Sequence, residues 1–231
     1  MSIGYDRVVP WGRSYGEYVA MFNLTPAELD MKILGCGDGP ASFNSVMNKE
    51  GNKAVSFDPV YQFTKDELQK RIDETYELVI EQTKVNLDKF VWDRIKTLED
   101  LVEVRMSAMN EFLSDYDAGK KEGRYVCGEL PVLPFPDDGF DLVLCAHFLL
   151  FYTENLTLDF HFKAVDEMLR VGKEIRIFPT LDLNSNVSKY LEPLKKYLGD
   201  KGIRFSEEKT SYEFQKNGNM MLKIHSKRNP L

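Results

Sequence analysis

The stretch MKILGCGDGP (residues 31–40) joins a short apolar run to a turn rich in glycine. Residues 31–34 predict a buried strand, and GCGDG (residues 35–39) follows without a break. Glycine permits a tight turn and lets a ligand approach the backbone closely. A helix is expected next, because Pro40 suits the first turn of a helix that ends near Gly51. The stretch therefore predicts a strand, a ligand-binding turn and a helix, although such a turn can also be purely structural.

An acidic residue stands at the end of the next predicted strand, residues 53–57. Asp58 follows the glycine turn by about 20 residues, a spacing at which an acidic side chain accepts hydrogen bonds from ribose hydroxyls. The alternative interpretation is a turn residue before Pro59. Together with the glycine turn, Asp58 favours a cofactor that contains adenosine. A dinucleotide fingerprint needs a third glycine where this chain has Pro40, which weakens the alternative of an NAD(P)-linked oxidoreductase.

Strand-like and helix-like segments alternate along most of the chain. This alternation predicts an α/β fold, with a doubly wound, mostly parallel sheet of seven strands. In the last two predicted strands, Asn217-Gly218 lies between strand patterns and predicts a hairpin. The remaining predicted strands are 125–127, 141–146, 174–178, 204–214 and 220–225, and the predicted helices between them are 158–169 and 187–198.

Residues 60–123 form a connection far longer than a strand-to-strand crossover needs. Residues 65–95 contain no glycine or proline and repeat apolar residues at helical spacing, and a second helix is expected over 97–118. The apolar faces of these helices must be buried. We expect this insertion to roof one side of the active site and shape acceptor choice, with Gln62 and Phe63 reaching the adenosine pocket. A dimer interface is the alternative role.

The composition narrows the class of protein. A chain of 231 residues suits one domain, here 1–231 with the insertion 60–123 inside it. A net charge of −7 argues against a generic nucleic-acid binder. Three cysteines without a CxxC pair and three histidines without ligand-like spacing suggest neither a disulfide framework nor a metal site. The longest apolar run, residues 140–152, is too short to span a bilayer. We therefore expect a cytoplasmic protein, a monomer or homodimer, with no membrane or nucleic-acid partner.

Several spaced motifs occur in the order found in one enzyme family. ILGCGDG, the acid in VSFDP and CGELPVLPFPDDGFDLVLCAHF resemble the motifs of class I S-adenosylmethionine-dependent methyltransferases. GDGPASFN with the long insertion resembles, more narrowly, a bacterial group described only as methyltransferase-like. The resemblance implies S-adenosyl-L-methionine as the cofactor and methyl transfer to an unidentified small-molecule acceptor. A noncatalytic nucleotide-binding sensor and a degenerate scaffold remain the alternatives.

The resemblance also implies roles for individual residues. It places Asp58 at the ribose, Glu129 at the adenine amino group and the Leu130 backbone beside the ring. It places Cys145, Ala146 and His147 beside the reacting sulfonium and the acceptor. The loop residues that it places around the methionyl and ribose portions are Gly35, Cys36, Gly37 and Gly39.

This chain departs from the family's pattern at one position. Ile33 replaces the usual acid two residues before the first glycine, so Asp38 is the candidate partner for the cofactor's amino group.

The N-terminal segment and one histidine complete the candidate site. Residues 11–18 can close over the cofactor, with Arg13 pairing a carboxylate and Tyr15 or Tyr18 lining the site. The same segment can equally be a helix packed on the sheet edge. His147 is the candidate catalytic residue, as a substrate-facing group or a general base, a role that depends on geometry.

Overall fold

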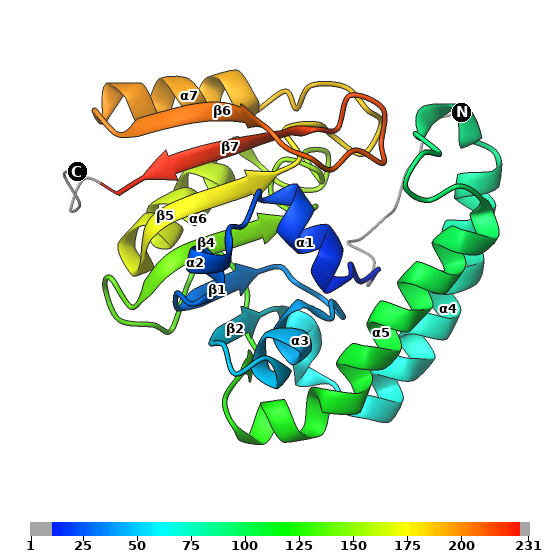
Figure 1. Cartoon of the computed structure of the whole chain (residues 1–231). Coiled ribbons are helices and arrows are strands. Elements are labelled where there is room, and N and C mark those ends of the chain that lie inside the picture. Colours follow the sequence, from blue (N-terminus) through cyan, green and yellow to red (C-terminus); the bar gives the residue numbers. More distant parts are fainter. Residues whose placement is uncertain (1–10, 227–231) are drawn as a thin grey trace.

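Seven strands form one mixed sheet in the computed structural model, which describes residues 11–226 (Figure 1). Their order is β3-β2-β1-β4-β5-β7-β6, and β7 runs antiparallel to both of its neighbours. The prediction of a doubly wound, mostly parallel sheet of seven strands is confirmed. The strands are β1 (Ile33–Cys36), β2 (Ala54–Phe57), β3 (Tyr125–Val126), β4 (Phe140–Ala146), β5 (Gly172–Phe178), β6 (Arg204–Lys209) and β7 (Met220–His225).

Helices cover both faces of this sheet (Figure 1). Along β4, Val143 and Cys145 pack in a cluster with α6 and α7. Leu142 and Leu144 point to the other face and pack with α1 and α3. Burial on both faces is what a parallel sheet requires. The covering helices are α1 (Tyr15–Met21), α2 (Pro26–Leu29), α3 (Phe43–Lys49), α6 (Leu158–Val171) and α7 (Leu191–Asp200).

The order of the strands creates a crevice at one edge of the sheet. The chain passes from β1 to α3 on one face and from β4 to α6 on the other. Because β1 and β4 are neighbours, these two connections diverge at the carboxyl ends of the strands. Ligands of open α/β sheets bind in such a crevice. The glycine turn follows β1 at this place.

The 60–123 segment places a pair of long helices beside the carboxyl ends of the strands (Figure 1). Each long helix begins at a capping box, Thr64 with Glu67 and Thr97 with Asp100. Their apolar faces bury a third core cluster together with Tyr61 and β3. The elements between β2 and β3 are η1 (Pro59–Gln62), α4 (Lys65–Lys84), η2 (Leu87–Lys89) and α5 (Leu98–Lys121).

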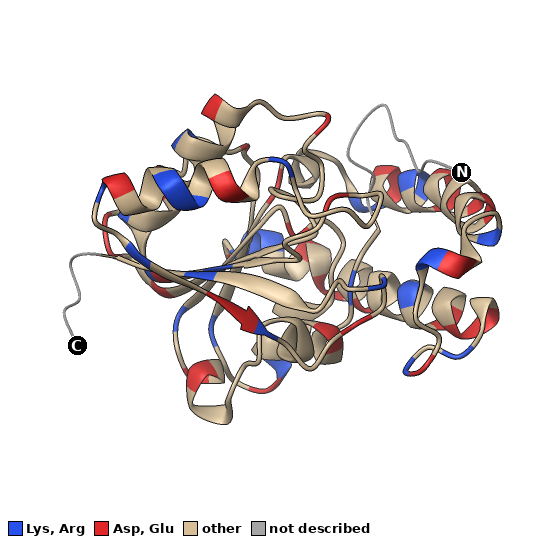
Figure 2. Ribbon diagram, turned by 90° about the horizontal axis from the view of Figure 1, so that it is seen from above, with Lys and Arg blue, Asp and Glu red and all other residues tan. Residues whose placement is uncertain are grey.

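Charged residues of both signs are interspersed on the helices around the sheet (Figure 2). On α4, for example, Lys70 lies 4.0 Å from Glu74. Such exposed pairs contribute little to stability. Among residues 11–226, no helix is both long enough and apolar enough to cross a bilayer.

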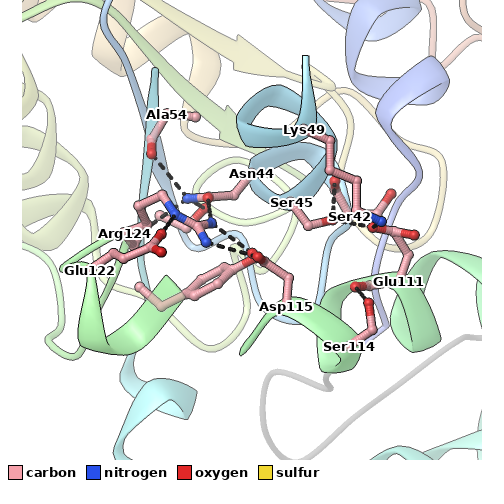
Figure 3. A network of polar contacts seen from close by, with 12 residues as sticks. Ser42, Asn44, Ser45, Lys49, Ala54, Glu111, Ser114, Asp115, Glu122 and Arg124 are labelled. Atoms are coloured by element: carbon pink, nitrogen blue, oxygen red, sulfur yellow. Dashed lines mark hydrogen bonds and ion pairs between the residues drawn. The ribbon is translucent and has the colours of Figure 1, made fainter. Parts of the chain in front are cut away.

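A partly buried polar network fastens α5 to the rest of the fold (Figure 3). Arg124 donates two hydrogen bonds to Asp115, at 2.6 and 2.8 Å, and a third to Asn44 of α3 at 2.8 Å. Glu111 of α5 accepts a hydrogen bond from Ser45 at 2.9 Å and pairs with Lys49 at 2.7 Å. Bidentate arginine–carboxylate contacts fix geometry as well as adding energy. The carboxyl-terminal half of α5 is thereby held on α3 and β3.

The helix predicted over residues 65–95 is wrong beyond Lys84, where α4 ends. The chain instead turns through Asn86, whose side chain is fully buried, and reaches the loop before β7. There the backbone N–H of Val91 donates to the carbonyl of Phe214 at 2.7 Å. This tertiary pairing replaces the helical hydrogen bonds that the local pattern predicted.

Two further boundaries differ from the sequence-based prediction. The predicted hairpin of the last two strands is confirmed, but its first strand is shorter than expected, because β6 ends at Lys209 and residues 210–219 form a long loop before β7. The two strands do pair antiparallel, as expected. The helix after the glycine turn begins at Phe43 and not at Pro40. Residues near Pro40 contact the N-terminal segment instead, since the N–H of Ser42 donates to the carbonyl of Arg13 at 3.1 Å.

Candidate active site

A cavity of about 390 Å³ lies at the carboxyl ends of the strands. The glycine turn, the ends of β2, β3 and β4, the N-terminal segment and the 60–123 segment all contribute to its walls. The structure thus brings together most of the residues that the sequence singled out. Those that line the cavity are Arg13, Tyr18, Gly37, Asp38, Gly39, Asp58, Glu129, Leu130, Ala146 and His147.

Three of the predicted residues lie beneath the cavity and not on its walls: Gly35, Cys36 and Cys145. Both cysteines belong to the cluster that packs against α6 and α7. Burial raises the pKa of the Cys145 thiol to about 12 and that of Cys36 well above its usual value. These thiols are therefore protonated and packed as small apolar groups. Gln62 and Phe63 also fall outside the cavity walls, where Pro59 and Val60 stand instead.

The shape of the glycine turn depends on the missing side chains. A Cβ on Gly35 would lie 1.9 Å from Oδ2 of Asp38. Gly37 has a φ of +71°, and its Cβ would lie 2.9 Å from the ring of Phe148. Gly39 also has a positive φ, +53°, but faces open space. The first two glycines thus let the turn fold, and the third leaves room beside the cavity.

Asp38 is held in place by two hydroxyl groups. Tyr18 donates to its Oδ1 at 2.8 Å, and Ser56 donates to its Oδ2 at 2.6 Å. Burial raises the pKa of Asp38 to about 6, and the two hydrogen bonds oppose this rise. Tyr18 comes from α1, so the N-terminal segment both packs on the sheet and contributes to the cavity wall.

Asp58 links β2 to the glycine turn. Its carboxylate accepts hydrogen bonds from the N–H groups of Gly39 and Val60, each at 2.8 Å. Each oxygen keeps a second lone pair that a ligand hydroxyl can use. Burial raises the pKa of Asp58 to about 6, and the charge of Glu129 adds to this rise. Asp58 and Glu129 therefore form an acidic end of the cavity.

Positive charge on the cavity wall comes from two arginines. Arg105 lies in the amino-terminal half of α5, and Arg13 precedes α1. Arg105 forms a buried ion pair with Glu17, with Nη1 2.5 Å from Oε2. Tyr212 donates to the other oxygen of Glu17 at 2.7 Å. Although burial opposes ionisation of Glu17, the charges of Arg105 and Arg13 hold its pKa at about 2. Arg13 and Arg105 both line the cavity.

Arg105 is the site residue that the sequence analysis missed. It lies on the buried face of α5, four residues after Leu101 and seven before Phe112, and only 1% of it is exposed. A charged residue on an apolar helical stripe is rare unless it is paired. That interruption of the stripe was the signal available in the sequence.

His147 stands at the end of β4 in a left-handed conformation, with a φ of +48°. Its ring contacts Phe151 and Phe178, with centroids 5.2 and 5.5 Å away. Burial, together with the charges of Arg13 and Arg105, holds the pKa of His147 well below its usual value. The imidazole is therefore neutral at neutral pH. Strained backbone of this kind in a non-glycine residue is often found at functional sites.

The 60–123 segment forms one side of the cavity. Val79, Gln82 and Thr83 of α4 and Leu101 of α5 are among the residues that line it. Phe90 also lines the cavity and stacks on Phe214, with ring centroids 4.9 Å apart.

The ring of Trp92 packs edge-on against the ring of Phe214, with centroids 5.5 Å apart. We call Phe90, Trp92 and Phe214 the aromatic clasp. The clasp joins the 60–123 segment to the β6–β7 loop across the cavity.

One protein of known sequence is similar along nearly the whole chain. No protein-family model matches this chain. The uncharacterized protein MJ0045 of Methanocaldococcus jannaschii is 35% identical over 215 residues, which cover 92% of this chain and 94% of that protein.

Several solved structures of methyltransferases resemble this chain at low sequence identity. Magnesium protoporphyrin IX methyltransferase from Synechocystis PCC 6803 with bound SAM is 11% identical, with a TM-score of 0.47, over 91% of this chain and 77% of that chain. A putative S-adenosylmethionine-dependent methyltransferase from Methanococcus maripaludis is 12% identical, with a TM-score of 0.47, over 94% and 85%. A TehB-like methyltransferase from Corynebacterium glutamicum is 15% identical, with a TM-score of 0.48, over 92% and 88%.

Proposed function

We infer that this chain, which belongs to the same family as the Methanocaldococcus jannaschii protein MJ0045, binds S-adenosyl-L-methionine and transfers its methyl group to a small molecule. One observation carries this proposal. The glycine turn, Asp58 and Glu129 follow three neighbouring strands and line one wall of a single cavity. A ligand with an adenine, a ribose and an amino-acid portion can contact all three at once.

The acidic end of the cavity suits the adenosine portion. The free lone pairs of Asp58 can accept hydrogen bonds from both ribose hydroxyls. Glu129 is exposed on the cavity wall beside the backbone of Leu130, where it can accept from the adenine amino group. Gly39 leaves open space next to Asp58, so the ribose can approach the backbone.

The methionyl portion suits the neighbouring part of the wall. Gly37 and Asp38 lie there, with Tyr18 behind Asp38. Arg13 lies next to the turn, because its carbonyl accepts from the N–H of Ser42. We assign the cofactor's amino group to Asp38 and its carboxylate to Arg13.

S-adenosyl-L-methionine supplies an electrophilic methyl group on a sulfonium. The acceptor's lone pair forms the new bond to the methyl carbon while the sulfur keeps the electrons of the broken bond. What the chain contributes is alignment and exclusion of water. Ala146 and His147, at the end of β4, lie where the acceptor must approach. A neutral His147 can accept a hydrogen bond from the acceptor's nucleophile and so orient it.

A binding experiment tests the cofactor. Calorimetry with S-adenosylhomocysteine, NADH and NADPH should show binding of the first alone. Asp58→Asn should weaken that binding by about 1.5–3 kcal/mol, the range for a hydrogen bond to a charged group. Asp200→Asn, at the end of α7 and away from the cavity, should leave it unchanged.

The outcomes separate the alternative functions. Binding of NADPH in place of S-adenosylhomocysteine would reject the methyltransferase proposal. Binding of S-adenosylhomocysteine without transfer of a labelled methyl group to any member of an acceptor library would instead favour a noncatalytic sensor or scaffold.

A further inference from the structure

Buried nitrogen atoms without partners gather on the basic side of the cavity. In residues 11–226, Nε and Nη2 of Arg105, Nε of Arg13 and Nδ1 of His147 are buried and have no hydrogen-bond partner. All three side chains line the cavity. Leaving a buried polar group without a partner is unfavourable, and leaving a charged one without a partner is more so. These four unpartnered nitrogen atoms around one cavity point to a ligand that forms hydrogen bonds with them.

Arg105 offers a complete edge of its guanidinium group. Glu17 bonds Nη1, which leaves Nε and Nη2 free. These two nitrogens carry parallel N–H groups, the geometry that matches the two oxygens of a carboxylate. The ion pair with Glu17 holds the guanidinium in one orientation, so this edge is preorganised.

The charges around Arg105 do not cancel. Arg13 and Arg105 are positive, Glu17 is the carboxylate paired with them, and His147 is neutral. One positive charge is therefore left over in the free protein, and the cofactor carboxylate assigned above to Arg13 would balance it. A ligand at the other edge of Arg105 is therefore selected by the hydrogen-bonding geometry of Nε and Nη2 and not by charge balance.

The remaining walls near this place are apolar. Phe90 and Phe214 of the aromatic clasp line the cavity together with Phe151, Val79 and Leu183. An apolar or aromatic body can bury its surface against them at roughly 25 cal/mol for each Å² removed from water. Arg105 itself belongs to α5, whereas the residues assigned above to the cofactor follow the strands or precede α1.

We propose that the methyl acceptor is a small carboxylic acid whose apolar body also carries a nucleophilic hydroxyl or amine, and that the Nε–Nη2 edge of Arg105 binds its carboxylate while the hydroxyl or amine takes the methyl group. The inference rests on the proposed function, because it names the acceptor of that same cavity. His147 and the aromatic clasp hold the rest of the acceptor beside the end of β4.

Pairs of acids and their amides, together with the substitution Arg105→Lys, test whether Arg105 binds the carboxylate of the acceptor. Aromatic and aliphatic carboxylic acids, each with its isosteric amide, are titrated into the complex with S-adenosylhomocysteine, and the thermal shift is followed. At least one acid should bind, and bind about tenfold or more tighter than its amide, the difference expected of a bidentate charged contact. Arg105→Lys keeps a positive charge beside Glu17 but removes the fork, and should erase that preference.

Two controls accompany the substitution. Arg176→Lys changes a buried, ion-paired arginine outside the cavity and should keep the preference for acids. S-adenosylhomocysteine and methylthioadenosine, which lacks the amino-acid portion, should both bind Arg105→Lys as they bind the wild type. If Arg105→Lys does not fold, the double variant Glu17→Gln, Arg105→Gln removes both charges together and replaces it, since removing a whole buried pair is better tolerated than removing half.

Three results would count against the proposal in different ways. Loss of S-adenosylhomocysteine binding with retained methylthioadenosine binding in Arg105→Lys would assign Arg105 to the cofactor's own carboxylate. Equal binding of acids and amides to the wild type would reject an acidic acceptor. If S-adenosylhomocysteine itself fails to bind the wild type, the proposed function fails, and titration of the acids alone still reports whether Arg105 holds a carboxylate.

Discussion

At the scale of single residues, Asp58 has two tasks. It accepts hydrogen bonds from the backbone of Gly39 and Val60, and it faces the cavity. The first task fixes the glycine turn and the second offers oxygens to a ligand. Burial makes the ionised form of Asp58 unfavourable and raises its pKa to about 6, so its charge changes within an accessible pH range.

We predict that affinity for S-adenosylhomocysteine falls as pH drops below about 6, because a protonated Asp58 loses the charge that strengthens its hydrogen bonds to the ribose, and protonation of Asp38 adds to the fall. The titration of Asp58 should affect folding stability with the opposite sign, so that the protein becomes more stable as pH falls. Between about pH 4 and 6 the folded state holds the Asp58 proton and the unfolded state has lost it, so unfolding free energy increases as pH falls. Calorimetry and urea unfolding from pH 5 to 8 measure both trends.

Asp58→Asn is the control for this pH effect. Asp38, whose pKa is also raised to about 6 by burial, titrates in both proteins, so the difference between them reports Asp58. Identical slopes in the wild type and Asp58→Asn would show that Asp58 does not control ligand binding.

Two glycines with the same backbone strain give a second prediction. Gly39 and Gly51 both have positive φ, +53° and +82°, and both face open space. Alanine at either position should cost about 1–2 kcal/mol of stability, the penalty of a left-handed conformation. Only Gly39 lines the cavity, so Gly39→Ala alone should weaken binding of S-adenosylhomocysteine. Similar binding by the two variants would remove the glycine turn from the cofactor site.

At the scale of elements, α5 links the core to the cavity. Its carboxyl-terminal half is fastened to α3 and β3 by Asp115 and Glu111 (Figure 3). Its amino-terminal half carries Leu101 and Arg105 to the cavity wall. A helix that is fixed at one end and lines the site at the other is suited to support acceptor binding.

Hydrogen exchange tests whether the 60–123 segment is part of the site. We predict that S-adenosylhomocysteine slows exchange of amides in residues 79–92, because Val79, Thr83 and Phe90 line the cavity. Amides of α7, on the other face of the sheet, serve as the control and should not change. If the protection of these amides does not change with the ligand but decreases when the protein is diluted, the segment is an oligomerisation element.

At the scale of the whole molecule, the 60–123 segment shares its core with the sheet. Tyr61, Phe112 and Tyr116 pack against Tyr125 of β3, and the aromatic clasp joins the segment to the β6–β7 loop. With contacts at both ends, the segment should unfold together with the sheet. The chain would then behave as one domain from residue 1 to 231, with an insertion.

A Trp11→Phe variant makes this measurable, since the sequence contains two tryptophans and Trp92 then reports alone. We predict that Trp92 fluorescence and circular dichroism show the same unfolding midpoint, as a two-state transition requires. A ligand at one hundred times its dissociation constant should shift both midpoints equally, and should raise the unfolding free energy obtained from either probe by about 2.7 kcal/mol. An earlier midpoint for Trp92 would mean that the segment unfolds on its own.

Local patterns in the sequence determined the order of strands and helices, the glycine turn and Asp58. Each of these depends on residues that are close along the chain, such as an apolar run followed by glycines. The same patterns overestimated the lengths of α4 and β6, because a local pattern does not register the pairing of Val91 with Phe214.

Only the tertiary structure revealed the basic side of the cavity. Glu17 and Arg105 lie 88 positions apart in the chain, and Phe90 and Phe214 also come from segments far apart in the sequence. Neither contact leaves a periodic signal, since each depends on where distant elements pack. Arg105 lines the cavity because α5 is fastened to α3 and β3, and that placement is a property of the folded core.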